Sequence, residues 1–221
     1  MGAVQTKICG LSDRTAIDAA RAGGADAVGF VFYPPSPRAV TPADAAGLAD
    51  HAAGLTRVGL FVDPDDALLD AVLDVVALEM IQLHGSESPE RVRAIRAARG
   101  LPVMKAIKVS GAEDFGAVSD YDSAASWLLF DAKAPKDRKD ALPGGNGLSF
   151  DWRLLAGRHG SLPWMLSGGL DADNVAEAVR ISGARWVDVS SGVERAPGVK
   201  DPDRIAAFLA AVRAIELSET V

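Results

Sequence analysis

Short runs of hydrophobic residues recur along the chain, and each is followed by residues with helical periodicity. The runs begin near Val4, Ala27, Arg57, Glu79, Val103, Trp127, Trp164 and Arg185. Six of the seven intervals between successive runs measure about 21 to 30 residues, which is close to the length of one strand, one helix and two loops. The pattern therefore predicts eight consecutive strand–helix units.

The hydrophobic runs are nearly continuous and do not alternate with polar residues. Residues 28–32, 58–62 and 127–130 consist of Val, Leu, Phe, Trp and Gly. Strands of this kind belong to parallel sheets that are covered on both faces. Eight units favour a closed barrel over a doubly wound open sheet, which usually has fewer strands. We therefore predict an α/β fold, a (β/α)8 TIM barrel in which residues 1–221 form a single domain.

Capping signals mark where several helices should begin. A capping residue precedes a proline at Thr41-Pro42, Ser88-Pro89 and Asp201-Pro202. These pairs satisfy free backbone N–H groups and preset the first helical turn. We also expect Ser12 to precede the first helix and Asp63 to cap a helix that starts at Pro64.

The interval between the sixth and seventh runs is longer than the others, at about 37 residues. Its excess spans residues 132–149 and is rich in cations and glycine: Lys133, Lys136, Arg138, Lys139, Gly144, Gly145 and Gly147. A long polar loop inside a compact domain is usually functional or disordered. Because this loop follows a barrel strand, we predict a mobile lid over an active site.

The composition is typical of an acidic globular protein with a buried core. Hydrophobic residues make up 48% of the 221 residues, and the net charge is −7. Such a chain lacks the basic field that attracts nucleic acid or an anionic membrane, so we expect neither as a partner. We see no signal peptide and no hydrophobic run of about 18 residues. The one cysteine, Cys9, excludes an intramolecular disulfide, and we expect a cytoplasmic protein.

Residues at the carboxyl ends of barrel strands are candidates for chemistry. This position selects Cys9, His84 and Asp131. The first and sixth strands lie three steps apart around a ring of eight, so Cys9 and Asp131 can flank a substrate from nearly opposite sides. Two proton-transfer groups in that arrangement suit an isomerase, which moves a proton between two positions of one molecule.

Glycine and serine residues end the seventh and eighth strands and predict a phosphate site. The residues concerned are Gly168, Gly169, Ser190, Ser191 and Gly192. Many barrels bind phosphate in these two loops, because glycine allows backbone N–H groups to approach the anion closely. Each segment alone has the simpler explanation of a sterically tight turn.

A set of motifs in fixed order resembles one known family over the whole chain. The motifs are Lys7-Ile8-Cys9-Gly10-Leu11, Gly29-Phe30-Val31-Phe32, Ser36-Pro37-Arg38, Val58-Gly59-Leu60-Phe61-Val62, Gln82-Leu83-His84-Gly85, Phe130-Asp131, Gly144-Gly145-Asn146-Gly147, Phe150-Asp151-Trp152, Ser167-Gly168-Gly169-Leu170 and Asp188-Val189-Ser190-Ser191-Gly192-Val193-Glu194. The chain resembles phosphoribosylanthranilate isomerase of the tryptophan pathway. It departs from the family pattern at Asn146, where a small hydroxyl residue is expected.

The resemblance implies a reaction and roles for two residues. The family rearranges N-(5-phosphoribosyl)anthranilate, a small phosphorylated amino-sugar, into 1-(2-carboxyphenylamino)-1-deoxyribulose 5-phosphate. Asp131 would be the general acid and Cys9 the general base. The resemblance implies no metal and no organic cofactor, because the nitrogen of the substrate serves as the electron sink.

Each candidate residue also has a purely structural interpretation. Cys9 could be a small buried hydrophobic residue, and a free thiol needs local help to act as a base at neutral pH, for which Lys7 on the same side of the strand is available. Asp131 could cap the turn after its strand. Arg38 follows three prolines and could grip the anthranilate carboxylate or lie in solvent. His84 and Asp188 could line the substrate pocket or be satisfied structural residues.

Two other functions remain open at this stage. One is the sister isomerase of histidine biosynthesis, which uses a carboxylate at the tip of the first strand, so that Cys9 and the Arg38 loop argue against it. The other is a catalytically silent barrel that binds a phosphate ligand, which would be expected to have lost Cys9 or Asp131. We expect a monomer, with a homodimer as the alternative.

Overall fold

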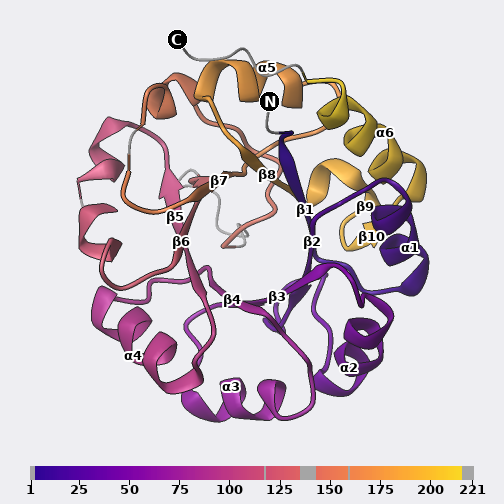
Figure 1. Ribbon diagram of the computed structural model, residues 1–221, viewed down its shortest axis with the longest axis vertical. Helices are drawn as coiled ribbons and strands as arrows, with labels where there is room; N and C mark the ends of the chain where they lie inside the picture. The colour runs from indigo at the N-terminus through magenta and orange to yellow at the C-terminus, as the bar shows by residue number, and fades with distance from the viewer. Residues whose placement is uncertain (1–2, 117, 135–142, 159, 216–221) are drawn as a thin grey trace.

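Eight parallel strands form a closed barrel in the computed structural model, which describes residues 3–116, 118–134, 143–158 and 160–215. The strands follow one another around the ring in chain order, with helices outside them (Figure 1). They are β1 (Gln5–Cys9), β2 (Ala27–Val31), β3 (Thr56–Phe61), β4 (Met80–Leu83), β5 (Val103–Val109), β6 (Trp127–Ala132), β7 (Trp164–Leu166) and β8 (Trp186–Val189). The predicted (β/α)8 fold class is confirmed, and each strand begins close to a predicted run.

The described α-helices begin at the capping signals or close to them. They are α1 (Arg14–Ala22), α2 (Pro42–His51), α3 (Asp66–Leu73), α4 (Pro89–Arg99), α5 (Val175–Ser182) and α6 (Pro202–Arg213). The side chains of Thr41, Ser88 and Asp201 accept hydrogen bonds from backbone N–H groups of the first turn, as predicted.

Two predicted caps lie elsewhere. Asp13 and not Ser12 caps α1, and Asp65 and not Asp63 caps α3. The backbone of Asp63 has a φ of 46°, and its Oδ1 accepts a hydrogen bond from the backbone N–H of Ser86 at 2.7 Å. Asp63 therefore joins the loops after β3 and β4, a contact that local sequence rules do not reveal.

Short 3-10 turns replace the helices predicted after β5 and β6 in the described residues. The turns are η1 (Ala112–Phe115), η2 (Val118–Tyr121) and η3 (Trp152–Leu155). The carboxylate of Asp114 accepts hydrogen bonds from the N–H and hydroxyl of Ser110, both at 2.8 Å, and from the N–H of Gly111. Such local bonds compete with the helical ladder, and the glycine also disfavours a helix.

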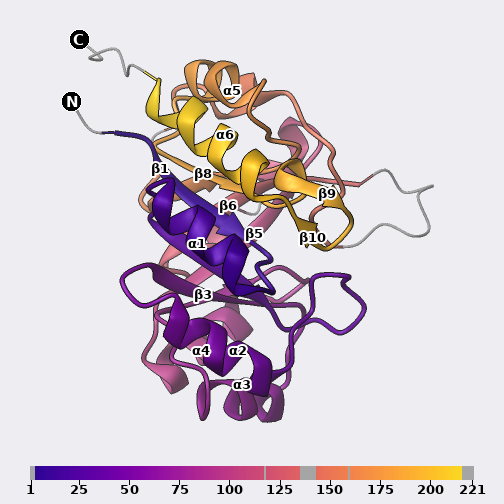
Figure 2. The ribbon, with the colours of Figure 1, turned by 90° about the vertical axis from the view of Figure 1, so that its right-hand side faces the viewer.

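A small antiparallel hairpin, formed by β9 (Glu194–Ala196) and β10 (Val199–Lys200), follows the 3-10 turn η4 (Ser191–Val193). The pattern of hydrophobic residues does not predict this hairpin. The hairpin lies at the end of the barrel where the strands finish (Figure 2). It brings Glu194 and Lys200 to the mouth of the barrel, where both side chains are buried.

The hydrophobic core occupies two places. The larger cluster fills the shell between strands and helices and includes Ile8, Phe30, Phe61, Phe130 and Phe208. A second cluster comes from alternate strand positions inside the barrel: Ala27, Val58, Met80, Met104, Ala106, Leu129 and Met165. The interior of the barrel is therefore packed below its mouth, which leaves the carboxyl ends of the strands as the place for a site.

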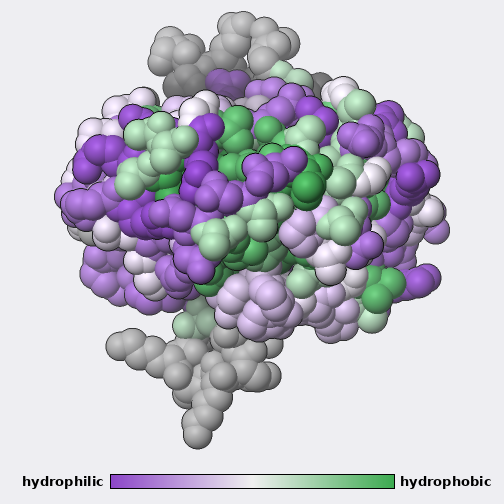
Figure 3. Space-filling model, turned by 90° about the horizontal axis from the view of Figure 1, so that it is seen from below, coloured by the Kyte–Doolittle hydropathy of each residue, from purple (hydrophilic) through white to green (hydrophobic). Residues whose placement is uncertain are grey.

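The outer surface carries few large exposed hydrophobic residues. Among the described residues they are Val75 and Val199. On the side of the molecule seen in Figure 3, hydrophilic residues surround small groups of hydrophobic ones. No helix in the described ranges is long and apolar enough to cross a membrane.

Candidate active site

A pocket opens at the carboxyl ends of the barrel strands. It brings together twelve of the thirteen residues that the sequence singled out: Cys9, Arg38, His84, Asp131, Gly144, Gly145, Gly147, Gly168, Gly169, Asp188, Ser190 and Ser191. Gly192, the remaining one, lies behind the wall, where its α-carbon abuts the Leu170 carbonyl. That contact places the turns after β7 and β8 directly against each other.

The Asp131 carboxylate stands at the end of β6, where the backbone of Ala132 and the ring of His84 hydrogen-bond to it. Its Oδ1 accepts from the backbone N–H of Ala132 at 2.9 Å, and its Oδ2 lies 3.0 Å from Nε2 of His84. The other ring nitrogen of His84, Nδ1, lies 3.0 Å from Nε2 of Gln82. A buried chain from Gln82 through His84 thus ends on the carboxylate, of which 5% is exposed.

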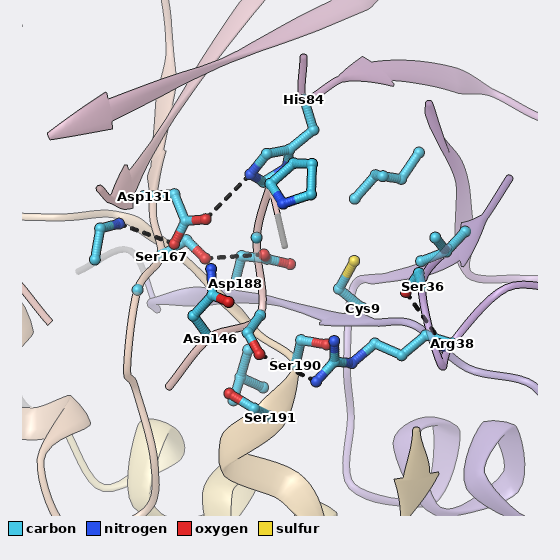
Figure 4. Close-up of a pocket in the computed structure, with 18 of the residues that line it drawn as sticks. Cys9, Ser36, Arg38, His84, Asp131, Asn146, Ser167, Asp188, Ser190 and Ser191 are labelled. Atoms are coloured by element: carbon cyan, nitrogen blue, oxygen red, sulfur yellow. Dashed lines mark hydrogen bonds and ion pairs between the residues drawn. The ribbon is translucent and has the colours of Figure 1, made fainter. Parts of the chain in front are cut away.

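The Cys9 thiol stands at the end of β1, across the pocket from Asp131 (Figure 4). A Cβ placed on Gly29 would lie 3.0 Å from the Cys9 sulfur and 3.2 Å from Nζ of Lys7. The Cys9 sulfur and Nζ of Lys7 therefore both border the space that Gly29 leaves open, and the two atoms lie within about 6 Å of each other. Burial raises the pKa of the Cys9 thiol, and the Lys7 ammonium partly offsets that rise.

A buried ion pair stands beside the thiol. Nζ of Lys7 lies 2.8 Å from Oδ1 of Asp188, and the hydroxyl of Ser167 donates to Oδ2 of Asp188 at 3.1 Å. Lys7 has no exposed surface. Burial alone would lower the pKa of Lys7, but the negative charges of Asp188 and of the Cys9 thiolate together outweigh burial and hold it above its usual value. Lys7 is therefore a fixed positive charge next to Cys9.

Arg38 reaches the pocket from the loop after β2, but a carboxylate already holds one edge of its guanidinium. Nε and Nη2 donate to the two oxygens of Glu194 at 2.7 and 2.9 Å, and Nη2 also donates to the Gly145 carbonyl at 3.2 Å. Only 5% of Arg38 is exposed, so it is not a solvated surface residue. A substrate carboxylate would have to bind at the Nη1 end.

The turns after β7 and β8 form the remaining wall, and a buried cation supports one of them. Nζ of Lys200 donates to the carbonyl of Ser190 at 2.8 Å, to its hydroxyl at 3.2 Å, and to Oε1 of Glu194 at 2.8 Å. Burial lowers the pKa of Lys200, and Glu194 opposes this effect. Lys200 thus places positive charge beneath the predicted phosphate loop and links it to Arg38 through Glu194.

Residues 143–148 of the predicted lid line the pocket. A Cβ on Gly144 would lie 2.7 Å from Nε2 of His84 and 3.1 Å from Oδ2 of Asp131. The glycine therefore allows the loop to approach the His84–Asp131 pair. Residues 135–142, which include Lys136, Arg138 and Lys139, lie outside the described residues.

Sequence reasoning missed four residues of the site: Gln82, Ser167, Glu194 and Lys200. Gln82 and Ser167 offered a local signal, because each is a polar residue in or just after a hydrophobic strand. Glu194 and Lys200 offered none, because their partners are set by the hairpin. Lys7, which was noted only as a neighbour of Cys9, proves to be wholly buried.

The fold and the pocket define a class of protein. A closed (β/α)8 barrel that presents a carboxylic acid and a thiol from strands three steps apart has the arrangement of an isomerase that moves protons within one substrate.

Comparisons with known proteins identify the family within this class. The family model of N-(5'-phosphoribosyl)anthranilate isomerase matches residues 6–211. The enzyme of that name from Paramagnetospirillum magneticum is 61% identical over 211 residues, which cover 95% of this chain and 97% of the relative. The relative from Paracoccus denitrificans is 59% identical over 209 residues, with 94% and 96% covered. The crystal structure of the Thermotoga maritima phosphoribosylanthranilate isomerase is 36% identical, with a TM-score of 0.83 and 95% and 98% of the chains covered.

The chain belongs to the N-(5'-phosphoribosyl)anthranilate isomerase family. It catalyses the rearrangement of N-(5-phosphoribosyl)anthranilate to 1-(2-carboxyphenylamino)-1-deoxyribulose 5-phosphate in tryptophan biosynthesis. The predicted resemblance is confirmed, and the comparisons favour neither the histidine-pathway isomerase nor a silent binding barrel.

Proposed function

We propose that Asp131 is the general acid and Cys9 the general base of this rearrangement. The observation that supports these roles is their placement: both groups line one pocket, from β6 and β1. Both are almost wholly buried and line that pocket. Proton transfer requires positioned groups of this kind.

The reaction then proceeds through ring opening, removal of the C2 proton and tautomerisation. Asp131 protonates the ring oxygen of the ribose, the bond from that oxygen to C1 breaks, and the nitrogen lone pair forms a C1–N double bond. The Cys9 thiolate removes the proton from C2, whose electrons form a C1–C2 double bond as the nitrogen regains its lone pair. The resulting enolamine tautomerises to the ketone, and no electrons leave the substrate.

Lys7 favours the thiolate form of Cys9 in this mechanism. Burial raises the pKa of Cys9, which would leave it protonated, and the nearby ammonium opposes that effect. Asp188 holds the ammonium in place at 2.8 Å. Asp188 is therefore a positioning residue for Lys7 and contributes to the polar wall of the pocket.

The remaining pocket residues bind the two anionic ends of the substrate. We assign the phosphate to the turns containing Gly168, Gly169, Ser190, Ser191 and Gly192, which follow β7 and β8. Lys200 supports this assignment, since its charge lies under Ser190. The anthranilate carboxylate binds at the Nη1 end of Arg38, which Glu194 holds in place from the other edge. One relative crystallised with reduced 1-(o-carboxyphenylamino)-1-deoxyribulose 5-phosphate, a product analogue with both groups.

In this proposal residues 1–221 form a single domain. The loop of residues 132–149 acts as a lid over its active site. Its described part contacts the acid and Arg38, because Gly144 abuts His84 and the Gly145 carbonyl accepts from Arg38. Closure over the substrate would exclude water from the iminium intermediate. Gly147 lies beside Ser191 and has a φ of 68°, a backbone conformation that favours glycine.

We further propose a monomeric, cytoplasmic enzyme. The scarcity of exposed large hydrophobic residues in the described ranges supports the monomer, although one Thermotoga maritima relative is described as dimeric. A free thiol at the active site supports a reducing compartment. Light scattering should give the mass of one chain, and the mass of two would contradict the monomer.

Two substitutions test the catalytic roles. Asp131→Asn keeps the shape but cannot donate a proton to the ring oxygen, and Cys9→Ser replaces the thiol by a hydroxyl that is far harder to ionise. Each should reduce turnover at least about 100-fold, while the reduced product analogue still binds. Turnover is followed by the loss of substrate fluorescence. Near-normal turnover of either variant would remove that residue from the mechanism.

A further inference from the structure

Gln82 is a polar residue inside the barrel to which the mechanism assigns no step. It lies on β4, two residues before His84, and its side chain has no exposed surface. Its Nε2 lies 3.0 Å from Nδ1 of His84. Its Oε1 is buried and has no hydrogen-bond partner among the described residues. A buried amide that leaves its oxygen unpaired loses stability, and its presence at this place therefore calls for another role.

The orientation of this amide decides where His84 carries its proton. A neutral imidazole has one donor nitrogen and one acceptor nitrogen. Because Gln82 donates to Nδ1, the proton of His84 lies on Nε2, and His84 donates to Oδ2 of Asp131 at 3.0 Å. A reversed amide would turn its oxygen to Nδ1 and make Nε2 an acceptor facing the acid.

The two tautomers have opposite consequences for the acid. An acceptor at Nε2 would compete with the substrate for the proton of Asp131. A donor at Nε2 cannot take that proton, and it occupies a lone pair on Oδ2, as the Ala132 N–H does on Oδ1. A carboxyl group has about four lone-pair positions, so these two bonds leave room for an acid proton that points into the pocket.

The unpaired Oε1 of Gln82 also favours the orientation in which Nε2 of Gln82 faces Nδ1 of His84. Either orientation leaves one polar atom of Gln82 without a partner. Protein interiors tolerate an under-satisfied carbonyl oxygen more readily than an orphaned N–H. The arrangement with Oε1 unpaired is therefore the less costly one, and it is the one that makes His84 a donor.

We propose that Gln82 is a positioning residue that fixes the Nε2–H tautomer of His84, so that His84 orients Asp131 and leaves the acid proton to the substrate. The proposal rests on the proposed role of Asp131 as general acid. It adds a distinct requirement, that a donor must stand at Nδ1 of His84. Residue 82 thus acts on the reaction through two intervening hydrogen bonds.

Two substitutions at this position separate the proposal from simple packing. Gln82→Glu keeps the shape but offers His84 only acceptors, which forces the proton onto Nδ1 or onto both nitrogens. Gln82→Met has a similar length and offers neither donor nor strong acceptor. Long-range ¹H–¹⁵N spectra report the tautomer directly, and His84→Leu assigns the signals among the three histidines of the chain.

The wild-type spectrum should show His84 protonated on Nε2, and Gln82→Met should show both tautomers. In Gln82→Glu the spectra should show His84 protonated on Nδ1 alone, and the kcat of this variant should lie at least about 10-fold below that of Gln82→Met, because only Glu then removes the donor at Nε2. That difference in kcat should vanish when each of the two substitutions is combined separately with His84→Leu. If Gln82→Glu does not fold, the wild-type and Gln82→Met spectra still decide the question.

Three results would overturn the proposal: a wild-type His84 protonated on Nδ1, equal kcat values for the two folded Gln82 variants, or a difference that persists without His84. A purely structural role predicts the second result. Failure of the acid assignment itself has another signature, which is normal turnover of Asp131→Asn whatever the tautomer of His84.

Discussion

Replacing Lys7 by methionine should suppress the ionisation of Cys9. The ammonium and the sulfur lie within about 6 Å of each other, as the space around Gly29 requires. At an effective dielectric constant of about 20, a charge pair at that distance contributes about 2.8 kcal/mol, which corresponds to about a 100-fold change in an equilibrium constant. Loss of the ammonium should therefore reduce the thiolate population about 100-fold at a given pH.

The rate of alkylation by iodoacetamide measures this population, because the reagent is uncharged and the chain has a single thiol. Burial raises the pKa of the Cys9 thiol, and the Lys7 ammonium lowers it. The rate of alkylation of the wild type should therefore increase with pH as the thiolate forms. In Lys7→Met the pKa of Cys9 is higher, so the same increase in rate should occur at higher pH. Lys7→Met also leaves Asp188 buried without its cation, at a cost of about 3–5 kcal/mol in stability. Folding must therefore be checked by circular dichroism at each pH.

Asp188→Asn is the matched control, because it disrupts the same ion pair with the opposite effect on the thiol. Asn keeps an oxygen that can accept from the Lys7 ammonium, so at a pH where Lys7 remains protonated the loss of the Asp188 charge, which raises the pKa of Cys9, should speed alkylation. General loosening of the barrel would speed alkylation in both variants. Equal rates in Lys7→Met and the wild type would refute the account of how the thiol is activated.

Three further predictions concern the substrate contacts. Arg38→Ala should weaken binding of the reduced product analogue by about 2–4 kcal/mol, measured as its inhibition constant, and an unchanged constant would leave Arg38 a structural partner of Glu194 alone. Gly144→Ala should lower kcat at least about 10-fold, because the new Cβ would lie 2.7 Å from Nε2 of His84. The control Gly47→Ala should leave kcat unchanged, because a Cβ there meets nothing within 4 Å. Equal effects of the two substitutions would exclude a specific lid contact. Crystals grown in sulfate should show an anion at the turns after β7 and β8, and an anion bound elsewhere with these turns empty would contradict the phosphate site.

The strand positions could be predicted from the sequence because their signal is local. A continuous hydrophobic run marks a buried parallel strand wherever it occurs, and the runs near Ala27, Val103 and Trp127 coincide with the starts of β2, β5 and β6. The Thr41-Pro42 and Ser88-Pro89 pairs predict their helices for the same reason. The positions of Cys9 and Asp131 follow once the barrel is assumed, since strand order fixes the angle between them.

What could not be predicted depends on partners distant in sequence or on competing local bonds. Arg38 and Glu194 are 156 residues apart, and only the fold reveals that their ion pair takes one edge of the guanidinium. The helix expected after β5 fails because Asp114 bonds to Ser110 and Gly111 in place of the helical ladder. Hydrophobic periodicity carries no information about either effect.

The most direct test of the central claim, that Cys9 is the base opposite Asp131, is the activity of protein alkylated at its single thiol. One carboxamidomethyl group per chain should abolish turnover in proportion to labelling, because the thioether cannot accept a proton and its bulk fills the place of the sugar. The bound reduced product analogue should slow the labelling. Fully labelled protein that converts N-(5-phosphoribosyl)anthranilate at the normal rate would contradict the account.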